Sequence, residues 1–297
     1  MTPPSTIGST EHSAARRYML PPGACDCHSH IFGPSGVFPF AHQPAYEPPL
    51  STPAVHRAML DRVGTARAVI VQPTPYGEDP RVILDALGHD RARLRGIVAA
   101  GADIDDLRLD SWGGGGVRGL RFVAAKSVSG APMPGAVGID QMLELGPRLV
   151  ERGWHAELWS SLDQTLEAWP AIERRQLPLV LDHMGGFALD RGLADPAFRR
   201  LLALVREGAV WVKLVLCRRV AMGASLDVLR PFHDALIEAN PDQLVWGSDW
   251  PFVRMGAYAP DAGGLADLFM EWVGDAALIE RILVHNPIRC YNFGAIA

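Results

Sequence analysis

The chain has 297 residues and a net charge of −5, with 48% hydrophobic and 21% charged residues, a composition typical of a soluble globular protein with a sizeable core. The negative charge argues against a nucleic-acid partner held through its phosphates, and no apolar run approaches the roughly 20 residues of a membrane-spanning helix. Four cysteines in a chain of this length do not indicate a disulfide framework. We therefore expect a cytoplasmic protein, a monomer or a homodimer, with no nucleic-acid or membrane partner.

Residues 1–20 lack the apolar core of a signal peptide, and we expect them to form a flexible N-terminal tail. From residue 21 to residue 297 the sequence shows no repeat, no low-complexity segment and no break in composition. These residues are therefore predicted to form a single domain.

Short apolar runs suited to buried strands recur along this domain. They are residues 24–30, 66–73, 94–101, 117–123, 154–160, 178–185, 210–216 and 244–251. Stretches with helical spacing, such as "LADPAFRRLLALVREG", lie between most of them. Strands that alternate with helices indicate a parallel sheet, and eight such units fit a (β/α)8 TIM barrel. A doubly wound open sheet is the alternative, but no glycine fingerprint follows the first strand.

Polar residues gather where the predicted strands end. In a barrel these carboxyl ends meet at one face, which carries the active site. The residues at these positions are His28, His30, Thr74, Arg121, Trp159, His183 and Asp249. A single histidine in a strand is usually a core residue, but three histidines and an aspartate at strand ends indicate a catalytic or metal-binding cluster.

The alternation of side chains along a strand orients the first of these segments. Residues two apart share a face, so Asp26, His28 and His30 are predicted to point into the barrel. Cys25 and Cys27 are then expected to face outward, as small buried residues under the helices.

The same rule points Arg121 into the barrel, where a buried guanidinium requires an anion. We therefore interpret Arg121 as a candidate clamp for a substrate carboxylate. Glu157 has two interpretations, a buried ion pair with Lys213 or a place in the site, and the residues alone do not decide between them.

Six motifs in order carry a resemblance to a known family. They are "DCHSHIFGPSGVFPF", "VIVQPTPYG", "GVRGLRF", "LDHMGG", "WVKL" and "VWGSDWP". From residue 21 to residue 293 the chain resembles the amidohydrolase superfamily, in particular its branch of 2-pyrone-4,6-dicarboxylate lactonases, sugar-acid lactonases and sulfomuconolactone hydrolases. The resemblance implies a hydrolase of carboxylic esters that opens the lactone ring of a small carboxylated compound.

The resemblance also implies roles for individual residues. Asp249 would take a proton from water and direct its attack on the lactone carbonyl. The histidines at positions 28, 30 and 183 would polarise that carbonyl and stabilise the oxyanion. Arg121 and Arg219 would bind substrate carboxylates, assisted by the hydroxyl of Thr74.

The chain departs from the family's pattern at two positions. Ser127, next to Lys126, stands where the dicarboxylate lactonases carry an arginine, and lysine does not reproduce bidentate binding of a carboxylate. We therefore expect Lys126 to be the remaining basic group there and a lactone with one carboxylate to be preferred over pyrone dicarboxylate. Trp159 stands where metal-dependent decarboxylases of the superfamily carry a histidine ligand and the pyrone lactonases a tyrosine.

The aromatic residue at position 159 favours a reaction without a cofactor. The alternative is one divalent metal ion such as zinc, held by His28, His30 and Asp249, with His183 as a further ligand or a proton partner. Two other functions remain open from the sequence. One is a metal-dependent decarboxylase on the same scaffold, and the other is a small-molecule binder without catalysis.

Overall fold

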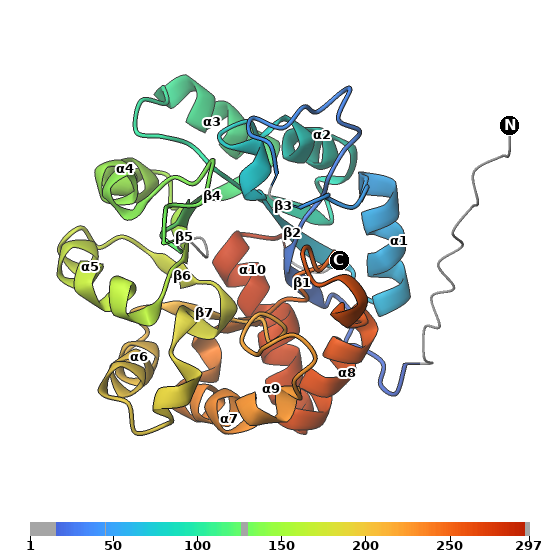
Figure 1. Cartoon of the computed structure of the whole chain (residues 1–297), viewed down its shortest axis with the longest axis vertical. Coiled ribbons are helices and arrows are strands. Elements are labelled where there is room, and N and C mark those ends of the chain that lie inside the picture. The colour runs from blue at the N-terminus through green and yellow to red at the C-terminus, as the bar shows by residue number, and fades with distance from the viewer. Residues whose placement is uncertain (1–15, 45, 126–129, 295–297) are drawn as a thin grey trace, which may run out of the picture.

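The computed structural model describes residues 16–44, 46–125 and 130–294. They form a (β/α)8 barrel, as the sequence predicted, in which the strands pair in parallel and in chain order from β1 to β8 (Figure 1). The strands are β1 (Cys25–Ser29), β2 (Arg67–Val71), β3 (Leu94–Val98), β4 (Val117–Val123), β5 (His155–Trp159), β6 (Leu179–Leu181), β7 (Trp211–Leu214) and β8 (Leu244–Trp246). Each lies within the segment expected for it.

All but the last of the helices surround the strands as a ring (Figure 1). The helices are α1 (Pro53–Val63), α2 (Arg81–Asp90), α3 (Asp106–Gly115), α4 (Ile139–Glu151), α5 (Leu162–Arg174), α6 (Pro196–Arg206), α7 (Arg230–Ala239), α8 (Ala262–Val273), α9 (Ala276–Glu280) and α10 (Asn286–Tyr291). None of the helices in the described ranges is both long and apolar enough to cross a membrane.

Local sequence explains where the outer helices lie. In α6 the buried residues Phe198, Leu201, Leu204 and Val205 recur at helical spacing, so one face packs on the sheet. The helix α5 begins at a capping box, in which the Ser161 hydroxyl accepts from the backbone N–H of residue 164 while that residue's side chain accepts from the Ser161 N–H. These signals place the helices on the outer faces of the strands.

The barrel closes where β8 returns to β1. The backbone N–H of Asp249 donates to the carbonyl of His28 at 2.8 Å, and the N–H of His30 donates to the carbonyl of Trp250 at 2.8 Å. Gly247 permits this close approach, because a Cβ at that position would lie 2.5 Å from the Cβ of His28. The closure thus joins the segments that carry the two histidines and the aspartate.

The carboxylate of Asp26 reinforces the same junction from inside the protein. It accepts hydrogen bonds from the backbone N–H of His28 at 3.1 Å and from the backbone N–H and hydroxyl of Ser248 at 3.0 and 2.5 Å. Asp26 is therefore engaged between β1 and β8, and the expectation that it points with His28 toward the site is wrong.

The two cysteines of β1 also face the other way from the prediction. Cys25 and Cys27 pack with Val69, Val71, Ile97 and Val245. In β2 the residues that alternate with these valines, Ala68 and Ile70, pack instead with the helices. The cysteines therefore lie inside the barrel. The register between β1 and β2 shifts between Asp26 and Ser29, so the simple alternation that the prediction assumed does not hold there.

The C-terminal segment fills the end of the barrel opposite the strand carboxyl ends. Tyr291 and Phe293 belong to the same interior cluster as Cys25 and Cys27, and α10 lies within the ring of outer helices (Figure 1). Arg95 donates to the carbonyl of Asn292 and its guanidinium lies over the ring of Phe293. Within the described residues, the C-terminal segment therefore packs the end of the barrel opposite the strand carboxyl ends.

Candidate active site

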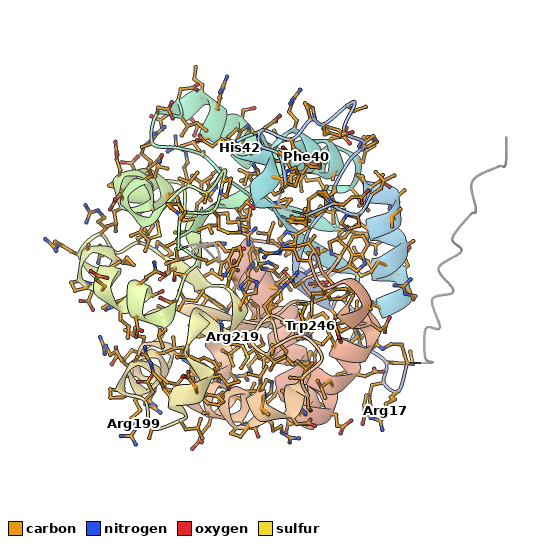
Figure 2. All side chains as sticks on the ribbon, in the orientation of Figure 1. Arg17, Phe40, His42, Arg199, Arg219 and Trp246 are labelled. Carbon is orange, nitrogen blue, oxygen red and sulfur yellow. The ribbon has the colours of Figure 1, made fainter. Side chains whose placement is uncertain are left out.

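A cavity of about 340 Å³ opens at the carboxyl ends of the strands. Its polar lining residues are His30, Tyr46, Thr74, Arg121, Trp159, His183, Arg218, Arg219, Asp249 and Arg254. Apolar residues, among them Met133, Val220 and Met255, complete the wall. Arg219 lies toward the middle of the molecule, whereas Arg17 and Arg199 project from its edges (Figure 2). The pocket lies where a TIM barrel carries its active site.

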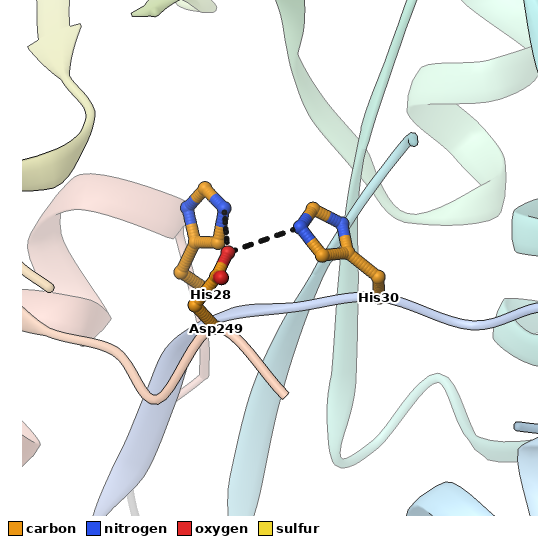
Figure 3. A group of neighbouring side chains, drawn as sticks. All are labelled: His28, His30 and Asp249. Atoms are coloured by element: carbon orange, nitrogen blue, oxygen red, sulfur yellow. Dashed lines mark hydrogen bonds and ion pairs between the residues drawn. The ribbon is translucent and has the colours of Figure 1, made fainter. Parts of the chain in front are cut away.

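Imidazole nitrogens converge on one carboxylate oxygen in the floor of this pocket. Oδ1 of Asp249 lies 3.2 Å from Nε2 of His30, 3.3 Å from Nε2 of His28 and 3.7 Å from Nε2 of His183. Figure 3 shows the rings of His28 and His30 on two sides of this oxygen. His28 is fully buried and does not line the cavity, so it acts on the site through Asp249 or through a group bound beside it.

The backbone at His183 and Asp249 turns these side chains into the site. Their φ angles are 48° and 64°, in the left-handed region that residues other than glycine rarely adopt. The ladders of β6 and β8 accordingly end at Leu181 and Trp246, before the ends that the apolar runs suggested. Such backbone conformations cluster at functional sites, and here both belong to predicted site residues.

Arg218 holds the second oxygen of the Asp249 carboxylate. Its Nε contacts Oδ2 of Asp249, and its Nη1 donates to the carbonyl of Val253 at 2.7 Å. Burial raises the pKa of Asp249, but the charge of Arg218, together with the contacts of His183 and His28, outweighs burial and holds this pKa well below its usual range. Asp249 is therefore an ionised carboxylate at neutral pH.

The hydrogen-bond partners of the His30 ring show which of its two nitrogens carries the hydrogen. Nδ1 lies 2.7 Å from the carbonyl oxygen of Val71, which only accepts, so Nδ1 carries a hydrogen. Burial lowers the pKa of His30 although Asp249 opposes this, and a neutral ring then turns the lone pair of Nε2 toward Asp249. Two acceptors 3.2 Å apart are suited to hold a proton or a metal cation between them.

A charged layer lies beneath the histidines. Nζ of Lys213 is 2.5 Å from Glu157 and 3.2 Å from Nδ1 of His28, while Asp182 lies 3.2 Å from the same Nδ1. Burial raises the pKa of Glu157, and the charge of Lys213 opposes this rise. Of the two interpretations of Glu157, the structure contains the ion pair with Lys213.

Arg121 points into the pocket as predicted from strand alternation. Its Nη1 donates to the carbonyl of Gln72 at 2.7 Å, its Nη2 lies 3.5 Å from Asp182, and its guanidinium lies 5.6 Å from the centre of the Trp159 ring. Its buried Nε has no hydrogen-bond partner among the described residues. An unpaired buried donor in a pocket wall is suited to an anionic ligand.

Three further predicted residues, Arg219, Trp159 and Thr74, complete this wall. Arg219 donates to the carbonyl of Phe187 and lies 4.9 Å from that residue's ring centre, and its Nε is also a buried donor without a partner among the described residues. Trp159 contacts the ring of His183, with the centres 5.5 Å apart. Thr74 lines the cavity, and Lys126 lies outside the described residues.

Sequence reasoning missed several residues that the structure brings to the site. Arg218, Arg254 and Tyr46 line the pocket, and Asp182 lies below it against Arg121 and His28. The three lining residues are in loops without periodicity, so no pattern marks them. Asp182 directly precedes His183, and alternation would place it on the opposite face.

The donor atoms of the cluster are close enough to share a metal ion. One ligand atom each from His28, His30 and Asp249 lies within 4.8 Å of the others. A second group with this spacing, His28, Glu157 and Asp182, surrounds the Lys213 side chain, which already supplies a positive charge. The first group is therefore the one suited to a metal.

Comparison with known proteins defines the class to which this fold and site belong. The family model described as Amidohydrolase matches residues 25–293, and the chain belongs to this family, as the motifs predicted. Among its relatives, the 2-pyrone-4,6-dicarboxylate hydrolase of Comamonas testosteroni is 32% identical over 287 residues, which cover 93% of this chain and 92% of that protein.

A second relative and a solved structure agree with this placement. The 4-sulfomuconolactone hydrolase of Rhizobium radiobacter is 34% identical over 300 residues, covering 97% of this chain and 96% of that protein. A crystal structure from Pseudomonas putida, solved as a candidate 2-pyrone-4,6-dicarboxylic acid hydrolase, superposes with a TM-score of 0.78 at 29% identity and covers 93% of this chain and all of that chain.

Proposed function

We propose that the protein is a hydrolase that opens the lactone ring of a small carboxylated compound. The observation that carries this proposal is the Asp249 carboxylate, which contacts Arg218 and the imidazoles in the floor of a pocket whose walls hold buried, unpaired guanidinium donors. The names of the relatives support the same chemistry, since both act on lactones or pyrones. We further propose that the protein acts in the cytoplasm, where its four free thiols would stay reduced.

Asp249 is the general base in the proposed reaction. A water bound against its Oδ1 would lose a proton to this carboxylate as the oxygen attacks the lactone carbonyl. The proton then lies between Oδ1 and the bare Nε2 of His30, 3.2 Å away, so the two residues share it. Collapse of the tetrahedral adduct would break the ring C–O bond, and the shared proton would pass to the leaving ring oxygen, which restores the carboxylate. Arg218 keeps the carboxylate ionised between turnovers.

The pocket walls would orient the substrate over this base. His183 would donate to the oxyanion that forms on the carbonyl, and its ring nitrogens have no hydrogen-bond partner among the described residues. Arg121 and Arg219 would bind the substrate's carboxylate through their free Nε–H groups, and Thr74 would add a hydroxyl contact. These roles hold the ester carbon near Asp249.

The cluster also fits a divalent metal ion by the spacing and chemistry of its donors. His28, His30 and Asp249 would hold such an ion, for example zinc, and it would polarise the carbonyl or the attacking water. Two cationic side chains already adjoin these ligands, Arg218 at Asp249 and Lys213 at His28. We therefore propose that hydrolysis needs no resident metal.

The decarboxylase alternative has less support from the site. Trp159 occupies the end of β5 and packs against His183, and an indole supplies no metal ligand. A protein that only binds its ligand would not need a carboxylate next to the unprotonated Nε2 of His30, an arrangement suited to accepting a proton.

A screen of carboxylated lactones, paired with metal analysis of protein purified without chelator, tests the proposal. We expect ring opening of at least one monocarboxylated lactone, unchanged after chelation and absent in Asp249→Asn. Carbon dioxide release from ring-free acids with no lactone hydrolysis would contradict it. Loss of activity on chelation that zinc restores would assign the metal to His28, His30 and Asp249.

A further inference from the structure

The buried layer below the pocket presents His28 with two competing partners. Lys213 extends from β7 and is fully buried, with Nζ 2.5 Å from Glu157 and 3.2 Å from Nδ1 of His28. Oδ1 of Asp182 lies 3.2 Å from the same ring nitrogen and 3.7 Å from the ammonium. Nδ1 is therefore equally close to a group that only donates and to one that only accepts.

The two partners require opposite tautomers of the ring. If Lys213 donates to Nδ1, this nitrogen is bare and the ring hydrogen is on Nε2. If Nδ1 carries the hydrogen and donates to Asp182, then Nε2 is bare and its lone pair faces Asp249, 3.3 Å away. The partner of Nδ1 therefore decides whether Nε2 turns a hydrogen or a lone pair toward Asp249.

The geometry of the contacts distinguishes these cases. The contact of Lys213 with Nδ1 is a hydrogen bond, whereas Oδ1 of Asp182 receives no hydrogen bond from any residue that the structure describes. The tautomer with Nε2–H also places a hydrogen, instead of a second lone pair, beside the negatively charged Oδ1 of Asp249. Both observations favour donation by Lys213.

We propose that Lys213 is a positioning residue that fixes His28 as the Nε2–H tautomer. His28 then turns its Nε2–H toward Oδ1 of Asp249, 3.3 Å away, as an electrostatic contact without hydrogen-bond geometry. It is not available as a metal ligand through Nε2, which must be deprotonated to bind metal. Glu157 anchors the ammonium from below, and the chain Glu157–Lys213–His28–Asp249 links the barrel interior to the site. This inference rests on the proposed function only for its consequence in catalysis.

The test removes the ammonium together with its buried counter-charge. Lys213→Met alone would leave Glu157 as an uncompensated buried carboxylate, so the variant is Lys213→Met/Glu157→Gln. Glu157→Gln alone is the matched control, because it keeps the ammonium beside His28. Thermal melting checks that each variant folds.

The tautomer is measured directly by NMR. In chelator-treated protein with ¹⁵N-labelled histidine, the two ring nitrogens have different chemical shifts when bare and when protonated. The signals of His28 are those that vanish in His28→Gln. We expect Nε2–H in the wild type and in Glu157→Gln, and Nδ1–H in the double variant, where Asp182 is the remaining partner.

Zinc binding provides a second readout that needs no substrate. Titration calorimetry should show zinc binding about tenfold tighter or more in the double variant than in Glu157→Gln, since the bare Nε2 joins His30 and Asp249 as a ligand. A wild type with Nδ1–H, or a double variant with unchanged tautomer and zinc affinity, would overturn the proposal. If the double variant does not fold, the wild-type tautomer alone decides. Failure to find a hydrolysed lactone would affect the proposed function and leave these two measurements intact.

Discussion

Replacing Arg218 with methionine should move the acid limb of the pH–activity profile. The guanidinium contacts Oδ2 of Asp249 and donates to the carbonyl of Val253. Methionine keeps most of the unbranched stem and removes the charge, so the pocket retains much of its apolar wall. The substitution therefore tests the electrostatic role of Arg218 separately from its packing.

The sign and size of the shift follow from the contacts of Asp249. The proposed base must be ionised, so activity is present above the pKa of Asp249 and is lost as the pH falls through it. A neighbouring opposite charge lowers a carboxyl pKa by about 1–3 units. The contacts of His28 and His183 with Asp249 remain in the variant, so we expect the lower part of this range. The acid limb should move upward by about 1–2 pH units.

The assay is kcat/KM against pH for a monocarboxylated lactone whose own carboxylate stays ionised over the range. Arg219→Met is the matched control, because the neighbouring arginine contacts Phe187 and has no contact with Asp249 in the described structure. It should raise KM and leave the acid limb in place. An unmoved limb in the Arg218 variant, or an equal shift in both variants, would refute the reasoning.

Four further outcomes are expected. Asp249→Asn should fold and lose about two or more orders of magnitude in turnover, and half the wild-type rate would remove it from the base role. Arg121→Met should raise KM for carboxylated lactones far more than for neutral analogues, whereas equal losses on both would make Arg121 structural. Pyrone dicarboxylate should show a lower kcat/KM than monocarboxylated lactones, because Ser127 stands where the family's pattern has an arginine. A tenfold preference for the pyrone would instead point to Arg254, which lines the pocket, as the group that binds the second carboxylate. Gly247→Ala should lower the free energy of unfolding by about 1–3 kcal/mol, since its Cβ would lie 2.5 Å from a side-chain atom of β1; an unchanged urea midpoint would contradict this.

The barrel could be predicted from the sequence because its strands and helices each leave a periodic pattern of apolar residues. Eight apolar runs separated by helical spacing define the topology, and the strand ends then collect His30, Arg121 and Asp249 at one face. These side chains come from different strands, but the rule that parallel strands end on one face needs no knowledge of the loops. The family resemblance implied roles for them, and of the residues it indicated within the described chain all but His28 line the pocket.

What the sequence did not predict depends on backbone geometry outside regular strands. The register shift in β1 turned Cys27 inward together with the adjacent His28, which strict alternation forbids. The left-handed backbone at His183 lets it and Asp182 both serve the site from adjacent positions. Arg218 reaches Asp249 from the loop after β7, where no spacing rule distinguishes it from Arg219.

The position of the C-terminal segment constrains how the protein can be synthesised. Tyr291 and Phe293 fill the inner layer against the cysteines of β1, so residues from the two ends of the chain pack together in the barrel's interior. A chain still emerging from the ribosome has made all its strands before it can supply this layer. The inner surface of β1 lacks this cover until residues 291–293 have left the ribosome, so the barrel cannot complete its packing before then. Nascent chains of this protein should therefore depend on chaperones late in synthesis, when most of the sequence is already outside the ribosome.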